Sequence, residues 1–301
     1  MAEQSDAQNY SASSFWAAPA RNFRTSARLH LQHFLFQNTL GFLLEPRVHS
    51  SIADLKSARV ADLGCGNGAW LLGLETELSN KGISAQLDGF DINEVNFPAA
   101  EFLPANVSLK PLDILARPLP EELLGAYDVV HVRAFISVIV NADLEPLLST
   151  AIALLKPGGW LQWEETRGDI WQAEVPSAGI PKTACETIIS VMNAGGKARG
   201  ASYEFLAELD QHVKASGYYQ EVEAQYVKKN RRDLKAWTED YLLVWEELAG
   251  YFPSRSKVPN APMSREDYLG LFGQVVSETE QGAVVHQREI VVVSGRKPTS
   301  G

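Results

Sequence analysis

The chain has 301 residues, a formal net charge of -10 at pH 7 and two cysteines, Cys65 and Cys185. This length can bury a large core, and the acidic balance argues against a nucleic-acid partner, because such proteins cluster Lys and Arg. Two cysteines make no disulfide framework. The polar N-terminus lacks a signal-peptide core, and the apolar run 129–140 contains His131 and Arg133 and is too short to span a bilayer. We therefore expect a cytoplasmic protein that binds no membrane.

The N-terminal part is expected to be an arm followed by a short helical region. Residues 1–25 are polar with scattered aromatic side chains, and residues 26–55 contain a helix that ends before Glu45-Pro46. Proline is disfavoured inside a helix because it lacks the backbone N–H donor. These stretches form the first predicted unit, residues 1–55.

A glycine-rich turn follows a short apolar strand and precedes an amphipathic helix. It runs from Asp62 to Gly68 and reads Asp-Leu-Gly-Cys-Gly-Asn-Gly. Glycine has no Cβ, so the backbone can turn sharply and approach a ligand closely. The order of strand, glycine turn and helix predicts a nucleotide-binding loop. Because Gly64-x-Gly66-x-x-Ala69 also fits the dinucleotide pattern, the turn alone leaves both a nicotinamide cofactor and S-adenosylmethionine (SAM) open.

Three acidic residues follow at the ends or starts of further predicted strands. Asp91 ends the second strand, where a carboxylate can accept both ribose hydroxyls of either cofactor. Asp113 follows the third strand and could accept from the adenine amino group, and Asp128 opens the fourth. A helix over 143–155 and a Lys-Pro-Gly-Gly turn lead into a fifth strand. This alternation predicts a mostly parallel sheet with helices on both faces.

After the fifth strand the simple alternation stops. The pattern predicts a helix around 201–216, a strand at about 218–227 and a final strand over 286–294. Two helices lie between these strands, one over about 235–249 and one that begins near Ser264. Ligands of open parallel sheets bind beyond the carboxyl ends of the strands. These two helices are therefore expected either to pack on the sheet or to form a lid over a pocket.

Taken together, these motifs resemble the class I SAM-dependent methyltransferases, and most closely the fungal small-molecule methyltransferases of secondary metabolism. The resemblance implies an α/β fold: a Rossmann-like seven-stranded sheet whose last strand is inserted antiparallel, with an N-terminal helical segment and a helical lid insertion. It divides the chain into an N-terminal arm and helical cap at 1–55, a SAM-binding core at 56–228, a lid or substrate insertion at 229–283, and a final strand and tail at 284–301.

The resemblance also implies SAM as cofactor and S-adenosylhomocysteine (SAH) as product. The expected cofactor-binding residues lie in the glycine turn, at the strand ends and in the N-terminal segment: Asp62, Gly64, Cys65, Gly66, Gly68, Asp91, Ile92, Asp113, Ile114, Arg133, Tyr10 and Arg28. Either Arg28 or Tyr10 would close over the cofactor carboxylate. Arg133 would hold that carboxylate or shape the pocket, unless it forms a surface salt bridge.

Two residues are candidates for proton transfer. His131 lies on the fourth strand, where it would take a proton or form a hydrogen bond within the sheet. Glu164 and Glu165 end the fifth strand, and alternation turns one of them inward. We expect Glu164 to be the inward, catalytic residue and Glu165 to be solvated. His30 and His33 have no third ligand at suitable spacing, so no metal site is expected.

The predicted function is methyl transfer to an oxygen, of a hydroxyl or N-hydroxyl group, in a small, largely apolar fungal metabolite such as an indole alkaloid. Nitrogen is the alternative acceptor. A SAM-binding protein that transfers no methyl group, a pericyclase or a regulator of secondary metabolism, also remains open. A nicotinamide enzyme is disfavoured by the Gly64-x-Gly66-x-Gly68 spacing. The expected partner is a small-molecule substrate, and a homodimer remains open.

Overall fold

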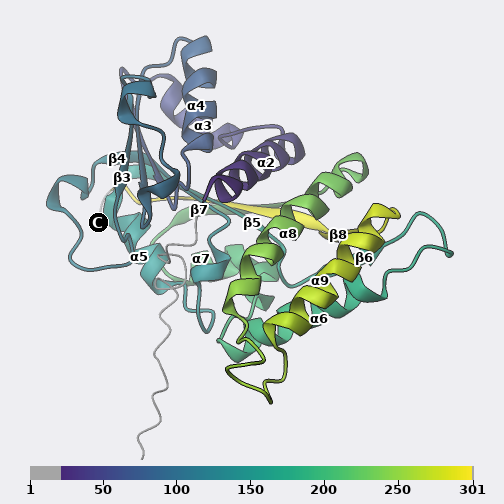
Figure 1. Ribbon diagram of the computed structural model, residues 1–301. Helices are drawn as coiled ribbons and strands as arrows, with labels where there is room; N and C mark the ends of the chain where they lie inside the picture. The colour runs from purple at the N-terminus through teal and green to yellow at the C-terminus, as the bar shows by residue number, and fades with distance from the viewer. Residues whose placement is uncertain (1–21, 300–301) are drawn as a thin grey trace, which may run out of the picture.

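The computed structural model describes residues 22–299, and its centre is one seven-stranded sheet (Figure 1). The strands are β1 (Ala58–Leu63), β2 (Ala85–Asp91), β3 (Val107–Pro111), β4 (Tyr127–Arg133), β5 (Leu155–Thr166), β7 (Gln220–Lys228) and β9 (Glu289–Arg296). Their order is β3-β2-β1-β4-β5-β9-β7. Strands β1 to β5 are parallel, and β9 is antiparallel to both of its neighbours. This confirms the predicted Rossmann-like sheet with its inserted antiparallel strand.

Helices cover both faces of this sheet, and a separate group of elements lies at one end. The helices are α2 (Phe23–Leu40), α3 (Pro46–Ala53), α4 (Ala69–Asn80), α5 (Glu145–Leu154), α6 (Thr183–Ala198), α7 (Leu209–Ala215), α8 (Leu234–Leu248) and α9 (Arg265–Glu280). Within residues 22–299, none of them is both long and apolar enough to cross a membrane.

Alternate residues of the strands belong to different apolar clusters. Val60 and Val129 pack with α3 and α4 on one face, whereas Ala61 and Val130 pack with α5 and α7 on the other. A third cluster joins α2, α6, α8 and α9 to the two-stranded sheet of β6 (Trp171–Glu174) and β8 (Val284–Gln287). Figure 1 shows α6, α8 and α9 gathered beside β6 and β8, away from α4.

The C-terminal half differs from the prediction in several elements, and strand β6 was not predicted at all. The strand expected over 286–294 is two strands, because β8 pairs with β6 whereas β9 pairs with β5 and β7. Helix α6 was missed, and glycines at positions 195 and 196 weaken its helical pattern. The helix expected around 201–216 is a 3₁₀ turn over Glu204–Glu208 followed by α7.

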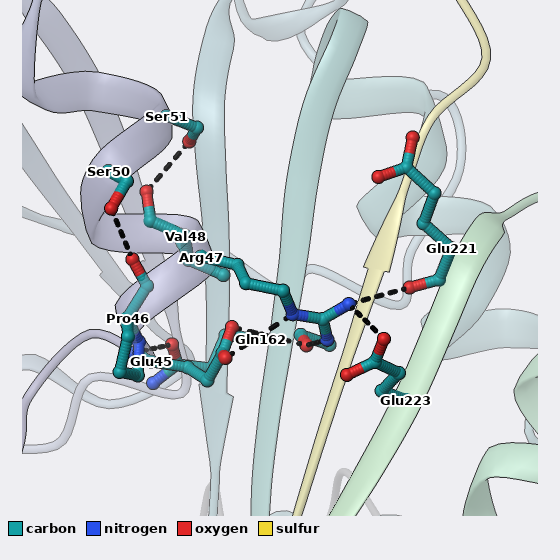
Figure 2. A network of polar contacts seen from close by, with 10 residues as sticks. Glu45, Pro46, Arg47, Val48, Ser50, Ser51, Gln162, Glu221 and Glu223 are labelled. Atoms are coloured by element: carbon teal, nitrogen blue, oxygen red, sulfur yellow. Dashed lines mark hydrogen bonds and ion pairs between the residues drawn. The ribbon is translucent and has the colours of Figure 1, made fainter.

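Polar contacts fasten helix α3 to the far strands of the sheet. Arg47 Nη2 donates to Ser294 Oγ on β9 at 2.7 Å, and its Nη1 lies 2.8 Å from Glu223 Oε1 on β7. Figure 2 shows the guanidinium group reaching from α3 toward Glu221 and Glu223. One side chain therefore connects the N-terminal region to two strands that come near the end of the chain.

Replacing Arg47 with methionine is expected to lower the free energy of unfolding by about 1 kcal/mol, because the half-buried group loses its hydrogen bonds to Ser294 and Glu221 and its ion pairs with Glu45 and Glu223. Urea denaturation would measure the change. The matched control is Arg231→Met, whose guanidinium is far more exposed and lies 3.2 Å from Glu174 Oε2; it is expected to change stability by less than about 0.5 kcal/mol. Equal effects of the two variants would contradict this role of Arg47.

Candidate functional site

The glycine turn connects β1 to α4 through three residues in the left-handed region, with φ of 73° at Gly64, 60° at Gly66 and 77° at Gly68. Residues with a Cβ are strained in this region. A Cβ on Gly64 would lie 2.9 Å from the Phe135 ring, and a Cβ on Gly66 would lie 3.0 Å from Leu29 Cδ1. The turn therefore requires glycine for its conformation and for the close approach of its neighbours.

Two acidic residues at neighbouring strand ends face the same edge of the sheet as the turn. Asp91, the last residue of β2, accepts from Gly66 N at 2.9 Å through Oδ2 and from Asn93 N at 3.0 Å through Oδ1. Asp113 follows β3, and its Oδ1 accepts from Leu115 N at 3.0 Å. Asp91 thus fixes the glycine turn to the end of the second strand.

A cavity of about 280 Å³ opens at this edge, between the strand ends, α2 and α8. Its lining includes these predicted cofactor residues: Arg28, Gly64, Gly66, Asp91, Ile92, Asp113, Ile114 and Arg133. Helix α8 contributes Asp240, Tyr241, Val244 and Trp245, whereas no residue of α9 lines it. Of the two helices considered for a lid, only α8 therefore borders the cavity.

The other predicted cofactor residues do not line the cavity. The Asp62 carboxylate is buried and accepts a hydrogen bond from His131 Nδ1 at 2.7 Å. Cys65 is buried in the turn, where its backbone N donates to Phe90 O at 3.0 Å, and Gly68 precedes the first residue of α4. Tyr10 lies outside the described residues. Cofactor-binding roles for these four residues remain predictions.

The expectation that Glu164 turns toward the cavity is wrong. Glu164 is 1% exposed, and its Oε1 accepts from Gln162 Nε2 at 2.6 Å and lies 3.6 Å from His131 Nε2. His131 stacks on Trp70 with ring centroids 3.6 Å apart and also does not line the cavity. Burial opposes protonation of His131, but the carboxylates of Asp62 and Glu164 outweigh it, so the pKa of His131 is raised. These three residues form a buried polar group across β1, β4 and β5.

The buried polar group of Asp62, His131 and Glu164 is connected through Gln162 to the segment before α3. The Gln162 side-chain oxygen accepts from Glu45 N at 2.7 Å, and its Nε2 also donates to Leu43 O at 2.9 Å. Gln162 and Glu164 therefore share the face of β5 that carries α3, which explains why Glu164 points away from the cavity.

Glu165 is the carboxyl group of β5 that lines the cavity, although the sequence suggested that it is solvated. Its Oε1 accepts from Phe135 N at 2.5 Å and from Trp163 Nε1 at 2.8 Å. Its Oε2 is buried and has no hydrogen-bond partner among the described residues. Burial raises the pKa of Glu165 to about 8, although hydrogen bonds from the Trp163 side chain and from the backbone of Phe135 and Ile136 lower it. The sequence pointed to this pair of adjacent glutamates, but the alternation of side chains along a strand did not determine which of the two faces the cavity.

Aromatic side chains form the wall between β6 and α8. The Trp171 ring centroid lies 4.7 Å from that of Tyr241 and 5.7 Å from that of Trp245. The Tyr241 hydroxyl donates to Gln287 Oε1 at 2.9 Å and accepts from Lys229 Nζ at 2.6 Å. Lys229 is buried, which lowers its pKa well below the ordinary value. This wall fits a flat, largely apolar ligand.

His33 of α2 belongs to the polar contacts beside the cavity, whereas His30 is exposed. His33 Nδ1 lies 3.2 Å from Arg133 Nη1, and burial, followed by the charge of Arg133, lowers the pKa of His33 to about 3. The neutral ring is therefore the acceptor that orients Arg133. Within residues 22–299, no three His, Cys, Asp or Glu side chains gather in a way that could hold a metal ion.

Known methyltransferases are similar to this chain. A family model described as a methyltransferase domain matches residues 61–161. The methyltransferase grgD of a Penicillium species is 37% identical over 159 residues, which cover 51% of this chain and 53% of the relative. Residues 61–161 are therefore similar to a methyltransferase domain. The N-methyltransferase tcpN of Claviceps purpurea is 34% identical over 152 residues, covering 50% of this chain and 51% of the relative.

The methyltransferase fold also occurs in a solved structure, phosphoethanolamine N-methyltransferase 2 of Haemonchus contortus in complex with SAM. That structure has a TM-score of 0.51 and 16% identity, covering 96% of this chain and 60% of that chain. The present chain spans about half the length of the curated relatives that it matches. The matched domain contains the glycine turn, Asp91 and Asp113, whereas Arg28, Glu165 and Asp240 lie outside it.

Proposed function

We propose that this protein is a SAM-dependent methyltransferase that methylates an oxygen, of a hydroxyl or N-hydroxyl group, in a small, largely apolar fungal secondary metabolite such as an indole alkaloid. One observation carries the proposal: the glycine turn, Asp91, Asp113 and Glu165 line the same cavity. The first three suit the cofactor, and Glu165 suits an acceptor that must lose a proton.

The residues of the strand ends fit SAM part by part. The left-handed glycine turn lets a ligand approach the backbone closely, and Asp91 is proposed to accept the ribose hydroxyls. Asp113 is proposed to accept the adenine amino group, with Ile92 and Ile114 beside the ring. When bound, SAM supplies an electrophilic methyl group on a sulfonium cation.

Glu165 is the group proposed to receive the proton of an acceptor hydroxyl, through the unpartnered Oε2. A pKa of about 8 suits a general base near neutral pH. Alignment of the reactants in an enclosed cavity can contribute about 7–11 kcal/mol, whereas a general base typically contributes 10²–10⁴-fold. The cavity walls are therefore expected to provide most of the catalysis, and Glu165 a substantial further part.

Nitrogen is the second candidate acceptor, and the similarity to tcpN, an N-methyltransferase, supports it. A neutral amine attacks through its lone pair and loses its proton afterwards, so the dependence on Glu165 would be weaker. The third candidate function is that of a methyltransferase-like protein that binds SAM without transferring its methyl group.

Incubation with methyl-labelled SAM and an extract of a producing fungus, followed by mass spectrometry, tests the proposal. We expect a labelled product whose fragmentation places the methyl group on oxygen. A label on nitrogen would replace the first candidate with the second. Tight SAM binding without a labelled product, across extracts known to contain candidate precursors, would contradict methyl transfer.

A further inference from the structure

Arg28 on α2 and Asp240 on α8 carry opposite charges, line the same cavity and form no ion pair with each other. Asp240 is 0% exposed, and within residues 22–299 neither of its carboxylate oxygens has a hydrogen bond of normal geometry, although the Gln32 amide lies near enough to lower its pKa. Arg28 is 5% exposed, its Nε also has no hydrogen-bond partner there, and that atom lies 3.7 Å from Glu247 Oε1. A buried carboxylate without partners is strongly unfavourable, and Arg28 keeps one nitrogen without a hydrogen bond beside its ion pair with Glu247, so both groups are suited to a ligand that completes them.

The charges around Asp240 favour its ionised form near neutral pH. Burial raises the pKa of Asp240 to about 6, while the charges of Arg28 and Lys229 and the amide of Gln32 lower it. The carboxylate is therefore mostly ionised at pH 7 and above. It can then accept hydrogen bonds from a cationic donor, which are stronger than those between neutral groups.

Helix α2 places Arg28 close to the glycine turn. Leu29, next to Arg28, would lie 3.0 Å from a Cβ on Gly66, and Asn67 Nδ2 donates to Ser26 O at 3.1 Å. Helix α8 is held against α2 by the Thr25 hydroxyl, which donates to Glu247 Oε1 at 2.9 Å. The aromatic wall shares α8 with Asp240 and adds Trp171 of β6, whereas Glu165 comes from the end of β5.

We propose that Asp240 binds the α-ammonium group of SAM, beside the α-carboxylate for which the resemblance already implied Arg28. An α-amino acid group carries both charges on one carbon, with signs opposite to those of Asp240 and Arg28. An amine on the acceptor would account for Asp240 alone, and a simple anion would account for Arg28 alone. The inference rests on the proposed function, because it takes SAM as the ligand of the cavity. It makes helix α8 part of the cofactor site.

Calorimetric titration with SAH tests the assignment without an acceptor. Asp240→Asn is expected to weaken SAH binding by about 10- to 100-fold, because the ammonium group loses a hydrogen-bonded partner of opposite charge. A SAH analogue without the α-amino group should bind the wild type and Asp240→Asn equally. Glu246→Gln is the matched control, because Glu246 lies on the same helix outside the cavity and pairs with Arg24 at 2.9 Å. It should leave SAH affinity unchanged.

A reciprocal variant keeps the test independent of Asp240. Arg28→Gln should weaken SAM binding but leave the binding of decarboxylated SAM unchanged. The assignment is overturned if Asp240→Asn weakens SAH and the deaminated analogue by the same factor, or if it leaves SAH affinity unchanged. If the wild type binds neither SAH nor 5′-methylthioadenosine, which lacks the amino acid group, the proposed function itself fails and this inference fails with it.

Discussion

Replacing Asp91 with alanine is expected to abolish useful SAM binding, with a loss of affinity of about 10²- to 10⁴-fold. The carboxylate accepts from Gly66 N at 2.9 Å, so its removal releases the glycine turn from the end of β2. It is also the proposed acceptor for the ribose hydroxyls. Hydrogen bonds to a charged group contribute about 1.5–3 kcal/mol each, and the variant loses more than one of them.

Calorimetric titration with SAH would measure the effect of Asp91→Ala, and circular dichroism would establish that the variant is folded. Glu94→Ala is the matched control, because Glu94 is an exposed acid three residues further along the chain; its affinity should equal that of the wild type. Unchanged SAH affinity in a folded Asp91→Ala variant would contradict both the cofactor assignment and the role of the turn.

The parallel half of the sheet could be predicted because each strand, turn and helix there is specified by nearby residues. The glycine turn fixes the transition from β1 to α4, and the acids Asp91 and Asp113 mark strand ends that must meet at one edge. The division of the last strand into β8 and β9 could not be predicted. Both segments are apolar, and only their separate partners, β6 for one and β5 with β7 for the other, distinguish them.

The site was predictable where it is built from strand ends and not where it depends on packing between distant elements. Glu164 and Glu165 are chemically identical neighbours, and the contact of Gln162 with the segment before α3 decides which of them faces the cavity. Asp240 is 212 positions after Arg28 in the sequence, and only the packing of α8 on α2 brings them to one cavity. Helical periodicity gives the faces of a helix but not its partner.

Glu165→Gln is expected to make the protein more stable at alkaline pH. The pKa of Glu165 is about 8 in the folded protein, compared with an ordinary value of 4.5. Between these values the folded state binds more protons than the unfolded state, so wild-type stability falls as the pH rises, by up to about 1.4 kcal/mol per pH unit. Glutamine does not titrate, so the stability of the variant does not fall in this way as the pH rises. Thermal unfolding of both proteins from pH 5 to pH 9 would show diverging melting temperatures, and parallel curves would contradict the raised pKa.

The same substitution is expected to lower turnover of a hydroxyl acceptor by about 10²- to 10⁴-fold while SAH affinity is retained. The amide oxygen can still accept from Phe135 N and Trp163 Nε1, so the cavity keeps its shape while the proton acceptor is lost. In the wild type kcat/KM should rise with pH up to about 8, the pKa of Glu165, and this rise should disappear in the variant.

Glu164→Gln separates the two neighbouring glutamates. The substitution removes a buried negative charge 3.6 Å from His131 Nε2, so His131 loses part of the charge that favours its protonated form. We therefore expect it to change the free energy of unfolding and not turnover. If Glu164→Gln slowed turnover with SAH affinity intact while Glu165→Gln did not, the base would be Glu164 despite its orientation. If neither variant slowed turnover, alignment alone would account for catalysis, which favours an acceptor that attacks without prior loss of a proton, as a neutral amine does.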